Sequence, residues 1–327
     1  MRAVICKEYG PPESLVVGEL PRPELGPDDV RIRVHACGVN FPDTLIIQGK
    51  YQIKPPMPFA PGGEVAGEVI EVGENVTTVK PGDRVMALTG YGGFAEEAVT
   101  RASRAIPIPA KMDYVTAAGF SMVYGTSYHA LIQRGRLQPG ENLLVLGASG
   151  GVGLAAVEIG KALGARVIAA ASSPEKLAIA KEHGADELIN YATEDLKERV
   201  KELTGGNGAD VIYDPVGGDA FDQCLRAINW DGRLLVIGFA SGRIPQAPAN
   251  LPLLKGSSIV GVFWGAFVNR DPETNYRNFQ HLFQLYDEGK IRPRVSKTYS
   301  LEQAADALND LMQRRATGKL VLTPQAS

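Results

Sequence analysis

The glycine-rich segment VLGASGGVG, at 145–153, has the composition of a phosphate-binding turn. It follows the apolar run NLLVL and opens a segment whose apolar residues have helical spacing. Glycine lets the backbone approach a pyrophosphate, and the N-terminus of the following helix offers unpaired N–H groups to the same anion. Because strand, turn, helix and second strand follow in order, we predict a dinucleotide site; a purely structural glycine turn is the alternative. The residues expected to contact the cofactor here are Gly147, Ser149, Gly150, Gly151, Val152 and Gly153.

The end of the second strand indicates which dinucleotide binds. A site for NAD usually has Asp or Glu there, where the carboxylate binds the ribose 2′-hydroxyl. This sequence reads AAASSPEK, in which Ser172, Ser173 and Lys176 can bond and neutralise a 2′-phosphate. We therefore predict NADPH. The alternative is that Ser173 only caps a helix and Lys176 is only a solvated helix residue. Each residue can also have both its local role and a role in binding phosphate.

These residues need a sheet to position them, and the chain from about residue 123 has the pattern of one. Strand-like apolar runs alternate with helical segments, and the helix at 173–184 is expected to begin at the N-cap Ser173. Repeated βαβ units predict a parallel, doubly wound α/β sheet. The expected strands include NLLVLG, ARVIAAA, ELIN, ADVIYDPVG, GRLLVIG and SSIVGVF.

The first third of the chain has a different pattern. Short alternating apolar runs at 30–39, 64–73 and 83–88, separated by Gly and Pro, predict a curled antiparallel β domain. After about residue 268 come two amphipathic helices and a last strand, KLVLTP. This tail is too short to be a domain, so we expect 268–327 to complete the first domain, 1–122, and 123–267 to be a nucleotide-binding insert.

Composition narrows the class of protein. The chain has 327 residues and a net charge of −3, which gives no reason to expect nucleic acid as the main partner. The sequence has no run of about 20 apolar residues, so we expect no transmembrane helix. The three cysteines are widely separated, so we expect neither a disulfide scaffold nor a zinc ribbon, and a cytoplasmic setting is the default.

End to end, the chain resembles the medium-chain dehydrogenase/reductase superfamily, and within it the zinc-independent quinone oxidoreductases similar to zeta-crystallin. The matching motifs are GVNFPD, PGGEVAGEV, VKPGDRV, LGASGGVGLAAVEIGKALGA, INY and TGKLVL. The resemblance implies a GroES-like catalytic domain with a Rossmann domain. It places Asn40 and Gly63 where zinc-dependent members have a ligand cysteine and a ligand histidine. Neither replaces its counterpart, so no metal site is expected, and Cys37 is expected to be a small buried residue.

Without a metal to polarise an alcohol or a ketone, the resemblance favours hydride transfer to an acceptor that is already electrophilic. We predict reduction of a quinone, at a site between the two domains. The alternative is reduction of an enoyl thioester, a 2-alkenal or another enone. A rival of another class is a binding module, because zeta-crystallin-like relatives also bind RNA; the near-neutral charge disfavours this role. The apolar edge strand SSIVGVF suggests a homodimer, as in relatives.

Three residues of the segment 36–51 are the expected catalytic group. By resemblance, Asn40 lies near the nicotinamide ribose, where its amide binds cofactor or acceptor oxygen, or else satisfies a turn. Asp43 is expected nearby, with a structural role in the loop as the alternative. The resemblance to mitochondrial enoyl thioester reductases implies that Tyr51 donates a proton or binds the acceptor; alternatively, it is an aromatic wall of the pocket.

The resemblance also assigns cofactor contacts along the rest of the chain. Thr126 and Tyr128 match a helix beside the nicotinamide, and Tyr191 matches a residue near the adenine or its ribose. Phe239, Phe263 and Trp264 lie at ends of expected strands, where open α/β sheets bind ligands, although aromatic residues there are often core. Two further residues are Lys319, which is expected to return to the cleft from the tail, and His129, which is expected to be a helix residue rather than a base.

Overall fold

The computed structural model describes residues 1–324, and it divides into two compact units. Unit 1 is Met1–Met122 with the chain from Pro293, and unit 2 is Val123–Arg292. The sequence predicts that the chain re-enters the first domain at about residue 268, whereas in the structure residues 268–292 still belong to unit 2. The reason is packing: in this segment Asn275 accepts a hydrogen bond from Trp264 Nε1, and His281 bonds to the Tyr128 hydroxyl.

Unit 1 contains a mostly antiparallel sheet, as its alternating apolar runs predict. The strand order is β14-β15-β3-β4-β5-β7, with β6 paired to β3, and only the pair β14 and β15 is parallel. A separate antiparallel pair joins β1 and β2. The strands are β1 (Arg2–Ile5), β2 (Val16–Glu19), β3 (Asp29–Val39), β4 (Glu64–Val72), β5 (Arg84–Leu88), β6 (Glu97–Arg101), β7 (Ala105–Pro107), β14 (Val295–Tyr299) and β15 (Lys319–Leu322).

Helices of unit 1 are short, and two of them position the site described below. Helix α1 follows β3 directly, and the helix α3 starts at Ser121, so its first residues belong to unit 1 and the rest to unit 2. The helical segments are η1 (Pro12–Ser14), α1 (Phe41–Ile46), η2 (Ala102–Arg104), α2 (Tyr114–Ala118), α3 (Ser121–His129), η4 (Leu301–Gln303) and α11 (Ala304–Met312).

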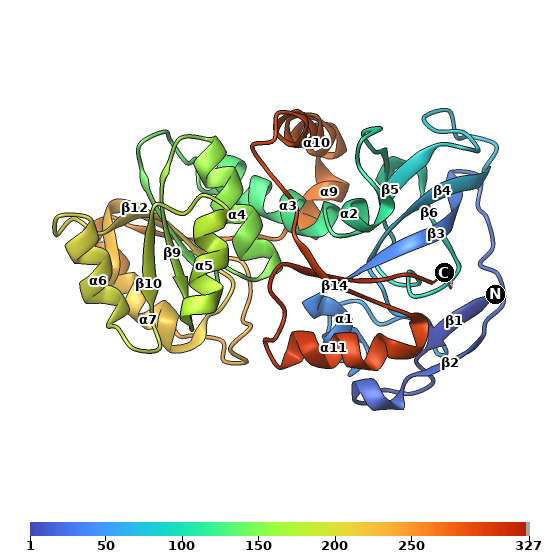
Figure 1. The fold of residues 1–327 in the computed structure, drawn as a ribbon, viewed down its shortest axis with the longest axis horizontal. Helices are drawn as coiled ribbons and strands as arrows, with labels where there is room; N and C mark the ends of the chain where they lie inside the picture. Colours follow the sequence, from blue (N-terminus) through green and yellow to red (C-terminus); the bar gives the residue numbers. More distant parts are fainter. Residues whose placement is uncertain (325–327) are drawn as a thin grey trace. The chain divides into compact units, whose positions relative to one another are not determined.

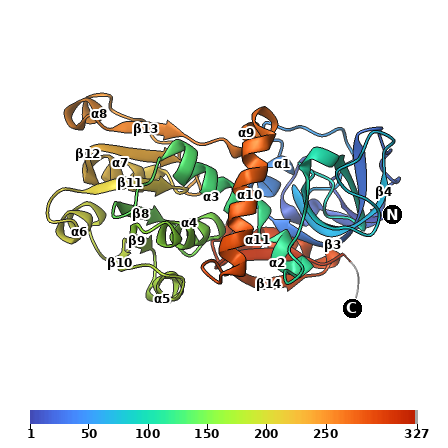
Figure 2. The same cartoon turned by 90° about the horizontal axis from the view of Figure 1, so that it is seen from above.

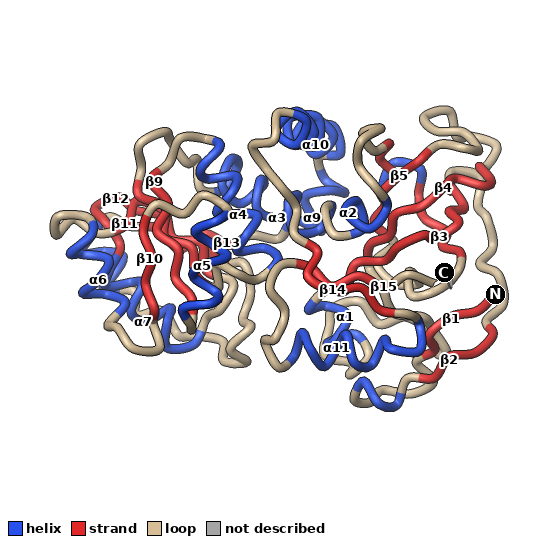
Figure 3. The backbone as a smooth tube through the Cα atoms, viewed as in Figure 1, coloured by secondary structure: helices blue, strands red, loops and turns tan. Residues whose placement is uncertain are grey.

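Unit 2 has the predicted parallel sheet (Figure 1). Its strand order is β10-β9-β8-β11-β12-β13. Its central strand is fully buried from Leu143 to Leu146, as expected where helices cover both faces. Figure 3 shows these helices in blue next to the red strands. The strands are β8 (Asn142–Leu146), β9 (Arg166–Ala171), β10 (Glu187–Asn190), β11 (Ala209–Asp214), β12 (Ile228–Val236) and β13 (Ser258–Gly261).

The helices of unit 2 include the long α10, which lies beside α9 (Figure 2). Helix α5 begins after the N-cap Ser173, whose side chain accepts a hydrogen bond from Lys176 N, as the sequence predicts. The helical segments are η3 (Ala130–Arg134), α4 (Gly151–Ala162), α5 (Pro174–Glu182), α6 (Leu196–Leu203), α7 (Gly218–Ala227), α8 (Asn250–Lys255), α9 (Trp264–Arg270) and α10 (Pro272–Asp287).

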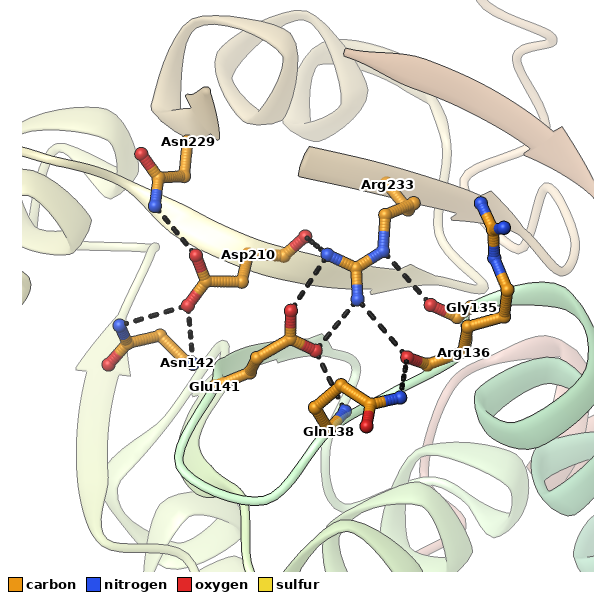
Figure 4. Close-up of polar contacts among 8 residues, drawn as sticks. All are labelled: Gly135, Arg136, Gln138, Glu141, Asn142, Asp210, Asn229 and Arg233. Carbon is orange, nitrogen blue, oxygen red and sulfur yellow. Dashed lines mark hydrogen bonds and ion pairs between the residues drawn. The ribbon is translucent and has the colours of Figure 1, made fainter. Parts of the chain in front are cut away.

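A charged network fixes the amino-terminal edge of this sheet (Figure 4). Arg233 of β12 makes a bidentate ion pair with Glu141, at 2.9 and 2.7 Å, and donates to the carbonyl of Gly135 at 2.9 Å. Asp210 of β11 accepts from the backbone N–H of Asn142 at 2.7 Å. Such paired, multiply bonded charges hold a strand end in one geometry. The opposite, carboxyl edge is therefore left for ligands.

Candidate functional site

A buried carboxylate, Glu64, is the centre of polar contacts in unit 1. The residue is 0% exposed and stands at the start of β4. Its Oε2 atom accepts from Ser121 Oγ at 2.7 Å and from Met122 N at 2.8 Å. Its Oε1 atom accepts from Asn40 Nδ2 at 2.8 Å and from Lys319 Nζ at 2.7 Å. A buried charge is costly unless it is paired and hydrogen-bonded, and Glu64 meets both conditions.

Lys319 is the cation that balances Glu64. It is 5% exposed, because β15 pairs with β3 and points this side chain inward. Its Nζ atom also donates to Asn40 Oδ1 at 2.6 Å and to the carbonyl of Val39 at 3.1 Å. These three bonds use all three protons of the ammonium group. The structure therefore places Lys319 in an internal ion pair, while its predicted contact with the cofactor stays a prediction.

The close approach of β3 to Glu64 depends on glycine. A Cβ atom at Gly38 would lie 2.3 Å from Glu64 Oε1 and 2.2 Å from the carbonyl oxygen of Ala118. Both distances are far below van der Waals contact, so no residue with a side chain fits there without moving the backbone. Gly38 thus allows the carboxylate to reach Asn40.

Asp43 holds the start of α1 in place. Its Oδ2 atom accepts from Asn40 N at 2.8 Å, and its side chain is 2% exposed. Burial raises the pKa of this carboxyl from 3.8 to about 7, although the bonded N–H of Asn40 and the charge of Lys319 act to lower it. The loop-holding alternative for Asp43 is therefore seen directly, and its catalytic role stays a prediction.

Tyr51 is half-buried against the apolar core of unit 1. Burial, and then the nearby charge of Asp43, raise the pKa of its phenol. Within residues 1–324 no hydrogen bond involves its hydroxyl. The hydroxyl of Tyr51 thus keeps its proton and remains able to donate it to a ligand.

The Cys37 thiol is buried and bonded within unit 1, and Gly63 has no side chain to bind a metal. Cys37 Sγ donates to the carbonyl of Glu64 at 3.0 Å, and burial raises the pKa of this thiol well above its usual value. A Cβ at Gly63 would lie 3.4 Å from Met122 Cε, 3.5 Å from Gly90 O and 3.8 Å from Asp43 Oδ1, which are ordinary contacts, so the backbone does not demand glycine there. In the part of the chain that the structure describes, no group of three or more His, Cys, Asp or Glu residues is arranged to hold a metal ion.

In unit 2 the predicted glycine turn forms at the carboxyl end of β8. Gly147 has a φ of +57°, a conformation that favours glycine, and a Cβ at Gly153 would lie 2.2 Å from the Gly147 carbonyl oxygen. Gly150 is the N-cap of α4 and gives no side-chain cap. The first N–H groups of this 12-residue helix are therefore not capped by a side chain, as an anion site requires.

The residues predicted to bind a 2′-phosphate lie together after β9. Ser173 caps α5, and Lys176 Nζ is 3.5 Å from Ser172 Oγ. The structure adds Glu175, whose pKa is lowered by a hydrogen bond with the Ser173 side chain. This exposed carboxylate was not considered in the sequence analysis, and it places one negative charge beside the basic Lys176.

The aromatic residues predicted to contact the cofactor have different surroundings. Tyr191 and Phe239 follow β10 and β12, at the same carboxyl edge as Gly147, and Thr126 is partly exposed on α3. Phe263 is 61% exposed before α9. The structure thus places Gly147, Ser172, Tyr191 and Phe239 at one edge of the sheet, and their contacts with a cofactor stay predictions.

Tyr128 and Trp264 make packing contacts within unit 2, and their predicted contacts with the cofactor stay predictions. The Tyr128 hydroxyl lies 2.5 Å from His281 Nδ1, and Trp264 is 5% exposed, with Nε1 bonded to Asn275 Oδ1 at 3.0 Å. A Cβ at Gly125 would lie 2.4 Å from the Trp264 ring, so that ring fills the core under α3. His129 stacks on Phe267 and bonds to Gln133, in agreement with its expected role as a helix residue.

Three buried carboxylates were missed by sequence analysis. They are Glu64, described above; Asp214, which accepts from the N–H groups of Val216 and Gly217, both at 2.8 Å; and Glu158. Glu158 Oε2 accepts from the Tyr124 hydroxyl at 2.5 Å, and Oε1 lies 2.5 Å from His183 Nδ1. The available signal is an acid within an apolar run, as in GGEVAGEV and LAAVEIG.

Comparison with known proteins agrees with both units. The sequence model of the alcohol dehydrogenase GroES-like domain matches residues 26–110, and that of the zinc-binding dehydrogenases matches 151–283. The chain is 44% identical, over 98% of its length and 88% of the relative's, to a quinone oxidoreductase-like protein 2 homolog of Nematostella vectensis.

Solved structures show the same similarity. A quinone oxidoreductase of Escherichia coli, complexed with NADPH, is 31% identical with a TM-score of 0.92, over 99% of this chain and 100% of that one. A 2-haloacrylate reductase is 32% identical with a TM-score of 0.86, over the whole of both chains.

The buried Asp43 gives a prediction for the dependence of stability on pH. Its carboxyl ionises near 3.8 when unfolded and near 7 when folded, so the folded state binds more protons between these values. The free energy of unfolding should therefore fall as pH rises from about 4 to about 7, by roughly 4 kcal/mol at 1.36 kcal/mol per pKa unit. Urea unfolding of wild type and Asp43→Asn across this range measures the difference, which the variant should remove.

The control is Asp28→Asn, which removes one exposed carboxylate from the same unit. Its stability curve should stay parallel to that of wild type. A curve for Asp43→Asn that is also parallel to wild type would contradict the raised pKa of Asp43.

Proposed function

Because this chain belongs to the medium-chain dehydrogenase/reductase family, in its quinone oxidoreductase branch, we propose that it is an NADPH-dependent reductase that transfers a hydride to a quinone. The observation that carries the proposal is the glycine turn of unit 2, which lies at the carboxyl edge of a parallel sheet. The helix that follows it, α4, begins without a side-chain cap. The similar Escherichia coli enzyme was solved as a complex with NADPH.

The residues of unit 2 fit this cofactor. The glycine turn and the N-terminus of α4 would hold the pyrophosphate, and Ser172 with Lys176 would hold the 2′-phosphate. When bound, NADPH supplies the hydride. The contribution of the chain is to bind and orient both partners and to donate hydrogen bonds where negative charge develops.

The chemistry of unit 1 supports the proposed acceptor class. Asn40 and Gly63 offer no strong metal ligands, and the positive charge between Asn40 and Glu64 is the ammonium of Lys319. That ammonium has no proton left for a ligand. An acceptor that needs no Lewis acid, such as a quinone, suits this arrangement.

A second candidate is reduction of an enone or enoyl thioester. Tyr51 favours it, because its hydroxyl has a proton to donate and no hydrogen-bond partner within residues 1–324. The similar 2-haloacrylate reductase acts on a conjugated acid, as its name states. In this case Tyr51 would donate a proton to the acceptor.

We also propose that the chain forms a homodimer through β13. This strand is the edge of the unit 2 sheet, and its residues Ser258, Ile259 and Gly261 are exposed. Exposed apolar side chains belong to the neighbouring elements; they are Trp230, Leu253, Leu254 and Phe263. An unpaired apolar edge is a place where a second strand adds.

No helix of the described residues is both long and apolar enough to span a membrane. The cytoplasmic setting stays a prediction.

Stopped-flow oxidation of NADPH against a quinone and against a crotonyl thioester separates the two acceptors. Wild type should reduce the quinone. If Tyr51 also serves as a proton donor, Tyr51→Phe should lower thioester turnover by about 10²–10⁴-fold and leave quinone turnover within a few-fold. Tyr91→Phe, at an exposed phenol of unit 1, is the control. Absence of thioester turnover in wild type would reject the second candidate, and absence of quinone turnover would reject the first.

Gel filtration with light scattering tests the dimer. Wild type should have twice the mass of one chain, and Ile259→Asp should dissociate it, because a charge then stands on the paired edge. Glu198→Gln, at an exposed position of α6 in the same unit, should leave the mass unchanged. A wild-type mass of one chain would contradict this proposal.

A further inference from the structure

Two consecutive hydrogen bonds in unit 2 end at the first turn of α4. Ser127 of α3 donates through Oγ to the carbonyl oxygen of Val152 at 2.9 Å. The same Oγ lies 2.8 Å from the hydroxyl of Tyr213, on β11. Both Ser127 and Tyr213 are 0% exposed. Side chains from a helix and from a central strand are thus joined to the start of α4 at one buried point.

Only one arrangement of the protons satisfies both bonds. A carbonyl oxygen can only accept, and a serine hydroxyl has a single proton, so the proton of Ser127 points to Val152. The Tyr213 hydroxyl must then be the donor to Ser127 Oγ. Burial raises the pKa of this phenol, so Tyr213 keeps the proton that it donates. Because hydrogen bonds in a chain polarise one another, the bond behind Ser127 strengthens the bond in front of it.

The carbonyl that receives this chain shares a peptide group with the N–H of Gly153. Leu154 N is bonded to Gly150 O at 2.8 Å, which closes the first turn of α4. The N–H of Gly153 precedes that bond, so it is one of the first N–H groups of the helix, which have no acceptor within the helix. A donor on the Val152 oxygen polarises this peptide and makes its N–H a stronger donor.

We propose that Ser127, supported by Tyr213, is a positioning residue for anion binding at the glycine turn. It fixes and polarises the peptide between Val152 and Gly153, although its own side chain is fully buried and touches no ligand. The inference rests on the proposed function, in which the anion is the pyrophosphate of NADPH. The affinity of the turn is then set in part by two hydroxyl groups outside the glycine motif.

Binding of NADPH without any acceptor, followed by fluorescence, tests the proposal. Ser127→Ala should raise the Kd for NADPH about three- to tenfold, the size of one hydrogen bond. Adenosine 2′-phosphate has the 2′-phosphate but no pyrophosphate, so its Kd, measured by displacement of NADPH, should change less than twofold. Tyr213→Phe keeps the bond to Val152 and removes only the donor behind it. It should give the same difference between the two ligands with a smaller rise, about twofold for NADPH.

The matched control is Thr204→Val, which removes another buried hydroxyl of unit 2. Thr204 is 8% exposed, and its Oγ1 donates to the carbonyl of Val200 and accepts from the N–H of Gly208, both at 2.8 Å. Its loss should lower the thermal stability of the protein, as the loss of Ser127 does, and leave the Kd of both ligands unchanged. Thermal unfolding shows whether each variant is folded, and Tyr213→Phe decides the question if Ser127→Ala is not.

A measurement without ligand separates this inference from the proposed function. In ¹⁵N–¹H spectra of protein labelled at glycine, the amide signal of Gly153 should shift in Ser127→Ala and in Tyr213→Phe, and stay in place in Thr204→Val. An unshifted signal in Ser127→Ala would overturn the inference even where NADPH binds normally. So would an unchanged Kd for NADPH, or equal weakening of NADPH and adenosine 2′-phosphate. A wild type that does not bind NADPH would reject the proposed function, and this inference with it.

Discussion

The buried ion pair between Glu64 and Lys319 is the interaction on which the site of unit 1 depends. It joins the start of β4 to β15, near the other end of the chain, and both side chains are 6% exposed or less. Removing two charges from water is costly, so such a pair persists only when every lone pair and proton has a partner. Here Ser121, Met122 and Asn40 supply those partners. The pair therefore organises the first turn of α1 and the first turn of α3 together.

The same principle recurs in unit 2, with different consequences. Glu158 is buried and bonded to Tyr124 and His183, and Asp214 binds two backbone N–H groups at the carboxyl edge of the sheet. Arg233 with Glu141 orders the amino edge. The ligand edge of unit 2, in contrast, is left with uncapped N–H groups of α4 and a basic Lys176. The buried charges of unit 2 thus have internal partners, and at the ligand edge the helix α4 begins without a side-chain cap.

The sequence predicts the parts of this protein that depend on local pattern. The βαβ order, the glycine turn and the Ser173 cap are encoded by spacing within a few residues, and the structure has all three. The partners of Lys319 lie 255 and 279 residues away, so no local pattern indicates that its ammonium is turned inward. The sequence predicts that helix α10 belongs to the first domain, and the structure places it in unit 2. The reason is related: an amphipathic pattern predicts a helix but does not say which surface its apolar face covers. The interior role of Trp264 likewise depends on Gly125, which only the fold brings to it.

A double-mutant cycle on the pair tests the central claim most directly. The free energy of unfolding would be measured for wild type, Lys319→Met, Glu64→Gln and the double variant. Lys319→Met leaves a buried carboxylate without its cation, so it should cost about 3–5 kcal/mol, and the double variant should cost clearly less than the sum of the two single ones. Costs that simply add, or a Lys319→Met variant as stable as wild type, would contradict the view that this ion pair holds the site together.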